Sequence, residues 1–157
     1  MFNETNSAKS QNGNNLNAIV YDLLVQAFNS GKIKDFKKEP RYNFPQYTYD
    51  QFSPDFEITL NDDSIIIIDN TTTARHDRFK QKQWDAFGIR NHFHALNKEI
   101  DYFVVLPNND SIGNVNTRKK EIDNYMHERK KNASPSYFSL ITDIIQIDDL
   151  VDILNSL

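Results

Sequence analysis

This 157-residue chain contains no cysteine, which excludes disulfide bonds and thiolate metal sites. A bound metal ion would therefore need oxygen ligands or the four histidines. The longest purely apolar run is Ile65–Ile68, far shorter than the roughly 20 residues that cross a bilayer as a helix. The start of the chain is polar and unlike a secretion signal. These absences predict a cytoplasmic protein.

Charge of either sign is moderate, and its distribution is more informative than its sum. The net charge of −4 argues against a protein that coats nucleic acid indiscriminately. Between residues 74 and 98, however, there are six Lys or Arg and two acids, whereas the last 17 residues hold four Asp and no base. Basic residues in the middle of the chain could follow a phosphate backbone. Solvated helix faces would leave the same pattern.

Hydrophobic spacing divides the chain into a short leader and one domain. Residues 1–15 lack apolar periodicity and are typical of a flexible leader, and residues 16–157 are expected to form a single domain. Apolar residues three and four apart predict a helix over 16–28. Residues 32–52 are basic and aromatic and include two prolines, which is typical of a loop or an irregular strand.

The rest of the chain alternates between strand and helix patterns. A hairpin is predicted from 55–60 and 64–69, with a turn at Asn61–Asp63 and a second strand buried on both faces. Further along, the pattern predicts a helix over 77–100 disturbed at Gly88, a strand at 102–106, a polar helix over 117–131, a strand at 141–147 and a final helix. This order predicts an α/β fold with a mixed central β-sheet flanked by helices.

Two acids stand at the ends of the predicted hairpin strands. Asp55 begins the first strand and Asp69 ends the second, so an antiparallel hairpin would bring the two carboxylates together. Such a pair suits Mg²⁺ or Mn²⁺, which binds a few carboxylates and keeps several waters. Glu57 shares the side-chain parity of Asp55 and is a third candidate metal ligand or a supporting group. Acids that merely form a turn and end a strand would give the same spacing.

Lys82 is the predicted positive charge of this centre. At 100° per residue it lies on the same helix row as Ile89 and Leu96, whereas Lys80 points almost the opposite way. A lysine that faces the sheet is costly to bury unless it meets an opposite charge, and the two carboxylates are natural partners. Gln83, one step round the helix, could join them. A lysine that snorkels past a helix end is the alternative.

The order of these residues resembles the PD-(D/E)xK nuclease superfamily. Pro54-Asp55 is followed, after thirteen residues, by Asp69-Asn70-Thr71, and a basic helix that contains glutamine comes next. The stretch from Thr71 to Asp85 also resembles type II restriction endonucleases. The resemblance covers residues 16–106. It implies a restriction-endonuclease-like core, a divalent metal such as Mg²⁺, and hydrolysis of phosphodiester bonds in double-stranded DNA that leaves a 5′-phosphate.

That resemblance assigns Asp55 and Asp69 to the two acids of the motif and puts Thr71 where the family has a lysine. Threonine cannot supply the positive charge of that lysine. Either Lys82 replaces it from the helix, or the site is weakened or dead. Asp22 on the first helix is a further acid that could contribute, as in some members of the family.

Basic residues near the proposed centre are the candidates for contacting DNA. Arg75, Arg78 and Lys80 flank it on the turn and the outer helix face, and would make nonspecific phosphate contacts. A chain this small would need a homodimer or a partner subunit to cut both strands. Two rival functions stay open: a noncatalytic DNA-binding or regulatory subunit on the same fold, and a small protein-interaction domain of the antitoxin or immunity type, which would explain the acidic C-terminal segment.

Overall fold

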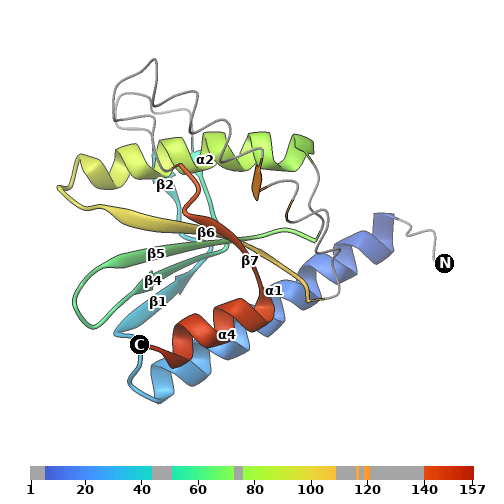
Figure 1. Cartoon of the computed structure of the whole chain (residues 1–157). Helices are drawn as coiled ribbons and strands as arrows, with labels where there is room; N and C mark the ends of the chain where they lie inside the picture. Colours follow the sequence, from blue (N-terminus) through green and yellow to red (C-terminus); the bar gives the residue numbers. More distant parts are fainter. Residues whose placement is uncertain (1–5, 44–50, 73–75, 109–115, 117–118, 121–139) are drawn as a thin grey trace.

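The computed structural model describes residues 6–43, 51–72, 76–108, 116, 119–120 and 140–157 (Figure 1). Within them, a five-stranded sheet has the order β1-β4-β5-β6-β7. Its strands are β1 (Asp35–Lys38), β4 (Phe56–Thr59), β5 (Ile65–Asn70), β6 (Ile100–Leu106) and β7 (Asp143–Gln146). β1, β4 and β5 pair antiparallel, and β6 and β7 continue the sheet parallel to β5. The predicted α/β fold with a mixed central sheet is confirmed.

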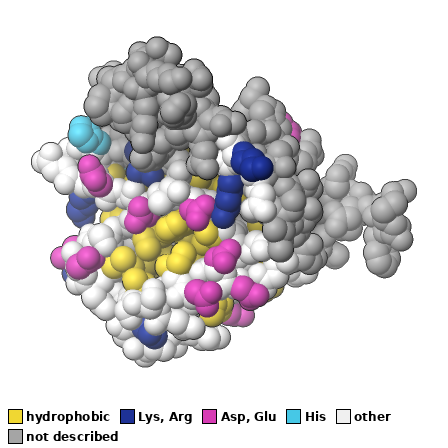
Figure 2. Space-filling view, in the orientation of Figure 1, with side chains coloured by type: hydrophobic (Ala, Val, Ile, Leu, Met, Phe, Trp, Pro, Cys, Tyr) yellow, Lys and Arg dark blue, Asp and Glu magenta, His cyan; other side chains and the backbone are white. Residues whose placement is uncertain are grey.

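Helices cover both faces of this sheet. α1 (Asn6–Asn29) and α4 (Ile147–Asn155) lie together on one face, and α2 (His76–His94) lies on the other (Figure 1). No helix in the described part of the chain is long and apolar enough to cross a membrane. On the side of the molecule seen in Figure 2, Asp and Glu side chains border a central stretch of hydrophobic atoms. Such an acidic border repels a phosphate backbone rather than attracting it.

The isoleucine run of β5 explains why the sheet is covered on both faces. Its side chains alternate, so Ile65 and Ile67 belong to the core under α2, and Ile66 and Ile68 belong to the core under α1 and α4. All four are buried. The prediction that this strand is buried on both faces is therefore confirmed.

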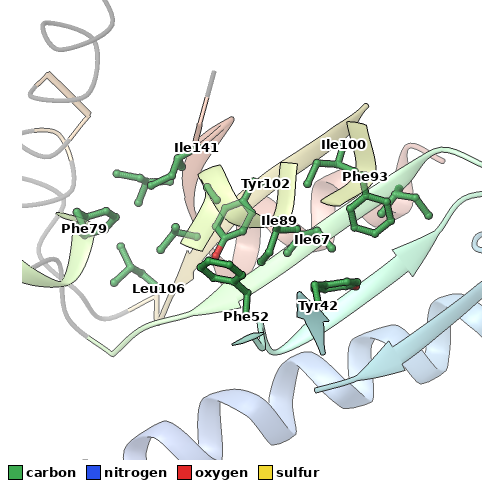
Figure 3. Close-up of a cluster of buried hydrophobic side chains, with 14 residues drawn as sticks. Tyr42, Phe52, Ile67, Phe79, Ile89, Phe93, Ile100, Tyr102, Leu106 and Ile141 are labelled. Carbon is green, nitrogen blue, oxygen red and sulfur yellow. The ribbon is translucent and has the colours of Figure 1, made fainter. Parts of the chain in front are cut away.

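A small hairpin packs against the side of α2. It consists of β2 (Tyr42–Asn43) and β3 (Gln51–Phe52), and both Tyr42 and Phe52 are buried in the core under α2 (Figure 3). Gly88 makes this approach possible, because a Cβ atom there would lie 2.2 Å from Cζ of Phe52. The predicted disturbance of the helix at Gly88 is wrong. α2 runs through Gly88 without a break, and the missing side chain admits the Phe52 ring instead.

The end of α2 differs from the prediction. The helix ends at His94 rather than at residue 100, because the chain turns at Asn97, whose φ of 59° is left-handed. The backbone N–H of Lys98 donates to the carbonyl of Phe93 at 2.9 Å, which closes the helix end. Leu96 consequently lies outside the helix and is 57% exposed.

The first helix is longer than predicted. Residues 6–15, which the sequence places in a flexible leader, continue α1, which begins at Asn6. Once the amphipathic part of a helix has formed, further residues join it without a new nucleation step. Residues 1–5 lie outside the described part of the chain, as does most of the polar helix predicted over 117–131. The predicted strand and helix near the end of the chain are confirmed as β7 and α4.

Candidate functional site

The hairpin of β4 and β5 brings Asp55 and Asp69 to the same end of the sheet. Phe56 pairs with Ile68 in the register, and the backbone N–H of Asp55 donates to the carbonyl of Ile68 at 3.1 Å. The backbone N–H of Asn70 donates to Oδ2 of Asp55 at 2.6 Å, which ties this carboxyl group to the end of β5. Both acids share the sheet face that α2 covers, because Asp69 has the same side-chain parity as Ile65 and Ile67 and Asp55 has that of Glu57. This is the end of β5 that leads into α2 (Figure 1).

Asp69 is a buried acid whose two carboxylate oxygens both accept hydrogen bonds. Nζ of Lys82 donates to Oδ1 at 2.7 Å, and the hydroxyl of Tyr102 donates to Oδ2 at 2.5 Å. The side chains of Lys82 and Asp69 are 15% and 6% exposed, so water screens this ion pair only weakly. A buried charge is tolerated only with such partners, and removal of one partner leaves the other uncompensated. The structure thus brings Lys82 and Asp69 together.

Lys82 faces the sheet because its neighbours on the helix are buried there. Phe79, Ala86 and Ile89 are at most 3% exposed and form the inner side of α2. The predicted helix row also included Leu96, which lies beyond the end of the helix. The orientation of Lys82 therefore depends on the first four turns of α2 and not on the full predicted stripe.

Asp55 lies in an environment that disfavours its charge. Burial, then the charge of Asp69 and a side-chain hydrogen bond with Asp69, raise the pKa of Asp55 to about 6, while the Asn70 N–H and the charge of Lys82 act in the opposite direction. The Lys82 ammonium thus bonds to Asp69 and acts on Asp55 only through its charge. A divalent cation beside the two carboxyl groups would reduce the remaining repulsion.

A third acid, Asp85, lies about one helical turn after Lys82 on α2. Burial and then the charge of Asp69 raise the pKa of Asp85, whereas a hydrogen bond from Gln81 and the charge of Lys82 lower it. Asp85 is therefore close enough to sense the charge of Asp69. No group of three or more His, Cys, Asp or Glu within the described ranges is arranged to hold a metal ion, so Asp85 does not complete a three-acid cage.

Glu57 points to the same sheet face but has other partners. Its Oε1 accepts a hydrogen bond from the hydroxyl of Tyr42, and Nζ of Lys37 lies 3.7 Å from its Oε2. The first of these contacts fastens the small hairpin to the sheet. Among the described residues, the structure does not group Glu57 with Asp55 and Asp69 as metal ligands.

The remaining predicted site residues are placed as follows. Thr71 is buried directly after β5, where its backbone N–H donates to a carbonyl of β6 at 2.9 Å. Gln83 is half-buried. Within the described residues, Asn70, Lys82 and Tyr102 donate the hydrogen bonds given above for Asp55 and Asp69, and Gln83 is not among these donors. Arg78 is exposed in the first turn of α2. Arg75 and the side chain of Lys80 lie outside the described residues.

Three residues near the two acids are absent from the predicted site residues: Tyr102, Asn17 and the third acid, Asp85. In the sequence, Tyr102 looks like one more residue of an apolar strand. A buried tyrosine hydroxyl usually needs a hydrogen-bond partner, so the hydroxyl itself was the signal that could have marked Tyr102. Asn17 on α1 accepts a hydrogen bond from Nδ2 of Asn70 at 2.8 Å, and nothing in the helix pattern marks it. Asp22, the acid considered on that helix, is exposed.

Two carboxyl groups, rather than a group of three, are the described candidates to hold a small, hard divalent cation. Asp55 and Asp69 offer carboxylate oxygens, and each oxygen that accepts one hydrogen bond retains a lone pair. Mg²⁺ usually binds one or two protein carboxylates and completes its shell with waters and phosphate oxygens.

A scan against protein-family models finds no match for this chain, and a search of curated proteins finds none either.

Proposed function

We propose that this chain is a metal-dependent DNA endonuclease that hydrolyses phosphodiester bonds, as a restriction endonuclease or as a subunit of one. The observation that carries the proposal is the shielded ion pair between Lys82 and Asp69, with Nζ 2.7 Å from Oδ1, beside the carboxyl group of Asp55. A carboxyl group whose pKa is raised by burial and by a neighbouring acid, as that of Asp55 is, is typical of active sites.

Lys82 supports the proposal because its ammonium would supply the positive charge that Thr71 cannot supply at the lysine position of the motif. In the PD-(D/E)xK pattern that this sequence resembles, a lysine follows the second acid by two positions, and Thr71 stands there instead. The ammonium of Lys82 reaches the same acid from α2. It would stabilise negative charge that develops on the phosphate and would orient the attacking water, without acting as a base.

Asp55 and Asp69 would hold a Mg²⁺ or Mn²⁺ ion. When bound, such an ion would lower the pKa of a coordinated water and stabilise charge on the phosphodiester. Arg78 lies exposed in the same first turns of α2 as Lys82 and would contact DNA phosphates. The substrate is double-stranded DNA, the expected setting is the cytoplasm, and cleavage of both strands would require a homodimer or a partner subunit.

The test is plasmid cleavage in Mg²⁺, Mn²⁺ and Ca²⁺ by the wild-type protein and two lysine variants. Lys82→Ala should lower the cleavage rate about 10²- to 10³-fold with little loss of DNA affinity, because it removes a charge needed at the reacting phosphate. Lys34→Ala is the matched control, since Lys34 also pairs with an acid, Asp63, but in an exposed pair near the turn between β4 and β5. Equal rates for Lys82→Ala and wild type would contradict the role of Lys82.

A noncatalytic DNA-binding or regulatory subunit on the same fold is the second candidate. It is favoured by Thr71 at the lysine position and by the fact that both oxygens of Asp69 already have partners. This candidate predicts salt-sensitive DNA binding with no cleavage in any of the three metals. A small protein-interaction domain would instead fail to bind DNA at moderate salt.

A further inference from the structure

We propose that Tyr102 is a positioning residue that acts through Asp69 and makes the site select Mg²⁺ over Ca²⁺. The inference rests on the metal site of the proposed function. It assigns a role to a core residue that has no charge and would not itself touch the metal ion or the DNA.

The geometry begins with the two donors on Asp69. The hydroxyl of Tyr102 on β6 lies 2.5 Å from Oδ2, and Nζ of Lys82 on α2 lies 2.7 Å from Oδ1. Each oxygen is thus tied to a different element of the fold. The carboxylate cannot rotate without losing at least one of these bonds, so its orientation is set before any cation arrives.

Tyr102 is itself held in place. Its side chain has no exposed surface, and it belongs to the core under α2 together with Phe52, Ile67 and Ile89 (Figure 3). In a packed core, side chains sit in rotamer minima and interdigitate with their neighbours. The donor on Oδ2 is therefore rigid, unlike a donor on a surface side chain.

A rigid carboxylate discriminates between the two cations for a chemical reason. Mg²⁺ requires near-ideal octahedral geometry, takes few protein ligands and keeps its waters. Ca²⁺ takes six to eight oxygens, often including a carboxylate that turns both oxygens to the ion, in a flexible arrangement. Within the described residues no third acid joins Asp55 and Asp69, so Ca²⁺ would depend on a reorientation of Asp69 that Tyr102 and Lys82 oppose.

The experiment measures binding of Mg²⁺ and Ca²⁺ by calorimetry without DNA, for wild type and Tyr102→Phe. Phenylalanine keeps the ring and removes the donor. Loss of such a supporting hydrogen bond should weaken Mg²⁺ binding about tenfold, with a smaller loss for Ca²⁺, so the affinity ratio should move towards Ca²⁺. Tyr42→Phe is the matched control, because it also removes a buried tyrosine hydroxyl from a carboxylate, that of Glu57, on the same sheet face.

A third protein, with 4-aminophenylalanine in place of Tyr102, keeps the ring and a weaker N–H donor. It should give an intermediate ratio, and it carries the test if Tyr102→Phe does not fold, which circular dichroism would show. An Mg²⁺-to-Ca²⁺ ratio equal to that of wild type in the folded variants would overturn the role of Tyr102 and leave the proposed function standing. Absence of metal binding by the wild-type protein would overturn both.

Discussion

Asp55 and Asp69 are neighbours in different environments. Asp69 has a strong donor on each oxygen, from Lys82 and Tyr102, whereas Asp55 accepts a backbone N–H from Asn70 and stands next to the charge of Asp69. The free energy of unfolding of the metal-free protein should therefore depend on the protonation of Asp55.

We predict that Asp55→Asn stabilises the metal-free protein above about pH 6. The pKa of Asp55 is about 6 in the folded protein against an ordinary 3.8, so between these values the folded state binds a proton that the unfolded chain does not. Stability of the wild type falls as pH rises through this window. Asparagine keeps an acceptor for the Asn70 N–H and carries no charge, so Tm should rise by roughly 5 °C at pH 8 and by less at pH 5.

Thermal melts in EDTA from pH 5 to pH 8 measure this difference. Asp152→Asn is the control, because Asp152 is exposed on α4 and its charge already lies in water. A gain for Asp55→Asn that stays constant across the pH range would mean that the charge of Asp55 is not the cause.

At the scale of the elements, the contact between the small hairpin and α2 depends on one missing side chain. The β2–β3 hairpin places Phe52 against Gly88. The ring centroids of Tyr42 and His92 are 4.9 Å apart, and His92 lies one turn after Gly88 on the helix. The hairpin thus follows one side of α2, the helix that carries Lys82.

We predict that Gly88→Ala destabilises the protein, against the usual preference of helices for alanine. Alanine in a helix is worth about 1 kcal/mol over glycine. Its Cβ here would lie 2.2 Å from Cζ of Phe52, a carbon of a buried ring that has little room to move. Overpacking of this kind costs about 1–3 kcal/mol. The net free energy of unfolding, measured by urea denaturation, should therefore fall.

A double-mutant cycle with Phe52→Leu identifies the cause. If the ring is the obstacle, Gly88→Ala should cost less, or even stabilise, when leucine replaces Phe52, because the two changes interact directly. Additive effects would show that the loss at Gly88 has another origin.

At the scale of the whole molecule, charge is unevenly arranged. The chain has a net charge of −4, and acidic side chains border the hydrophobic stretch seen in Figure 2. Attraction of DNA would thus have to come from local basic residues near the site rather than from the sum of charges. Arg78 is the one predicted phosphate contact whose side chain is described, and it is exposed.

We predict that Arg78→Ala weakens binding to all DNA sequences alike. Loss of one phosphate contact should reduce the slope of log K against log salt by about one unit. Fluorescence anisotropy with two unrelated duplexes at several salt concentrations measures both quantities. Lys32→Ala is the control for the loss of one positive charge. Lys32 is held near the end of α4, where its Nζ donates to the carbonyl of Asn155 at 3.0 Å. An effect confined to one duplex would instead indicate direct base readout.

The sequence by itself determined the β4–β5 hairpin and the position of the two acids at its open end. The turn at Asn61–Asp63 and the β-branched run before Asp69 are local signals that predict a hairpin, and the register of a hairpin is fixed by its turn and loop length. Asp55 and Asp69 follow from that register. The side of α2 that faces the sheet also follows from local spacing, which is why the orientation of Lys82 was predictable.

Only the tertiary structure decided what completes the site. Tyr102 reaches Asp69 across 33 positions of sequence, Asn17 reaches Asn70 across 53, and Glu57 is held by Tyr42 instead of joining the acids. The use of Gly88 also depends on a contact between separate elements, because Phe52 of β3 packs against it. A buried carboxylate takes its hydrogen-bond donors from whichever elements pack against it, and no periodicity within one element records which these will be.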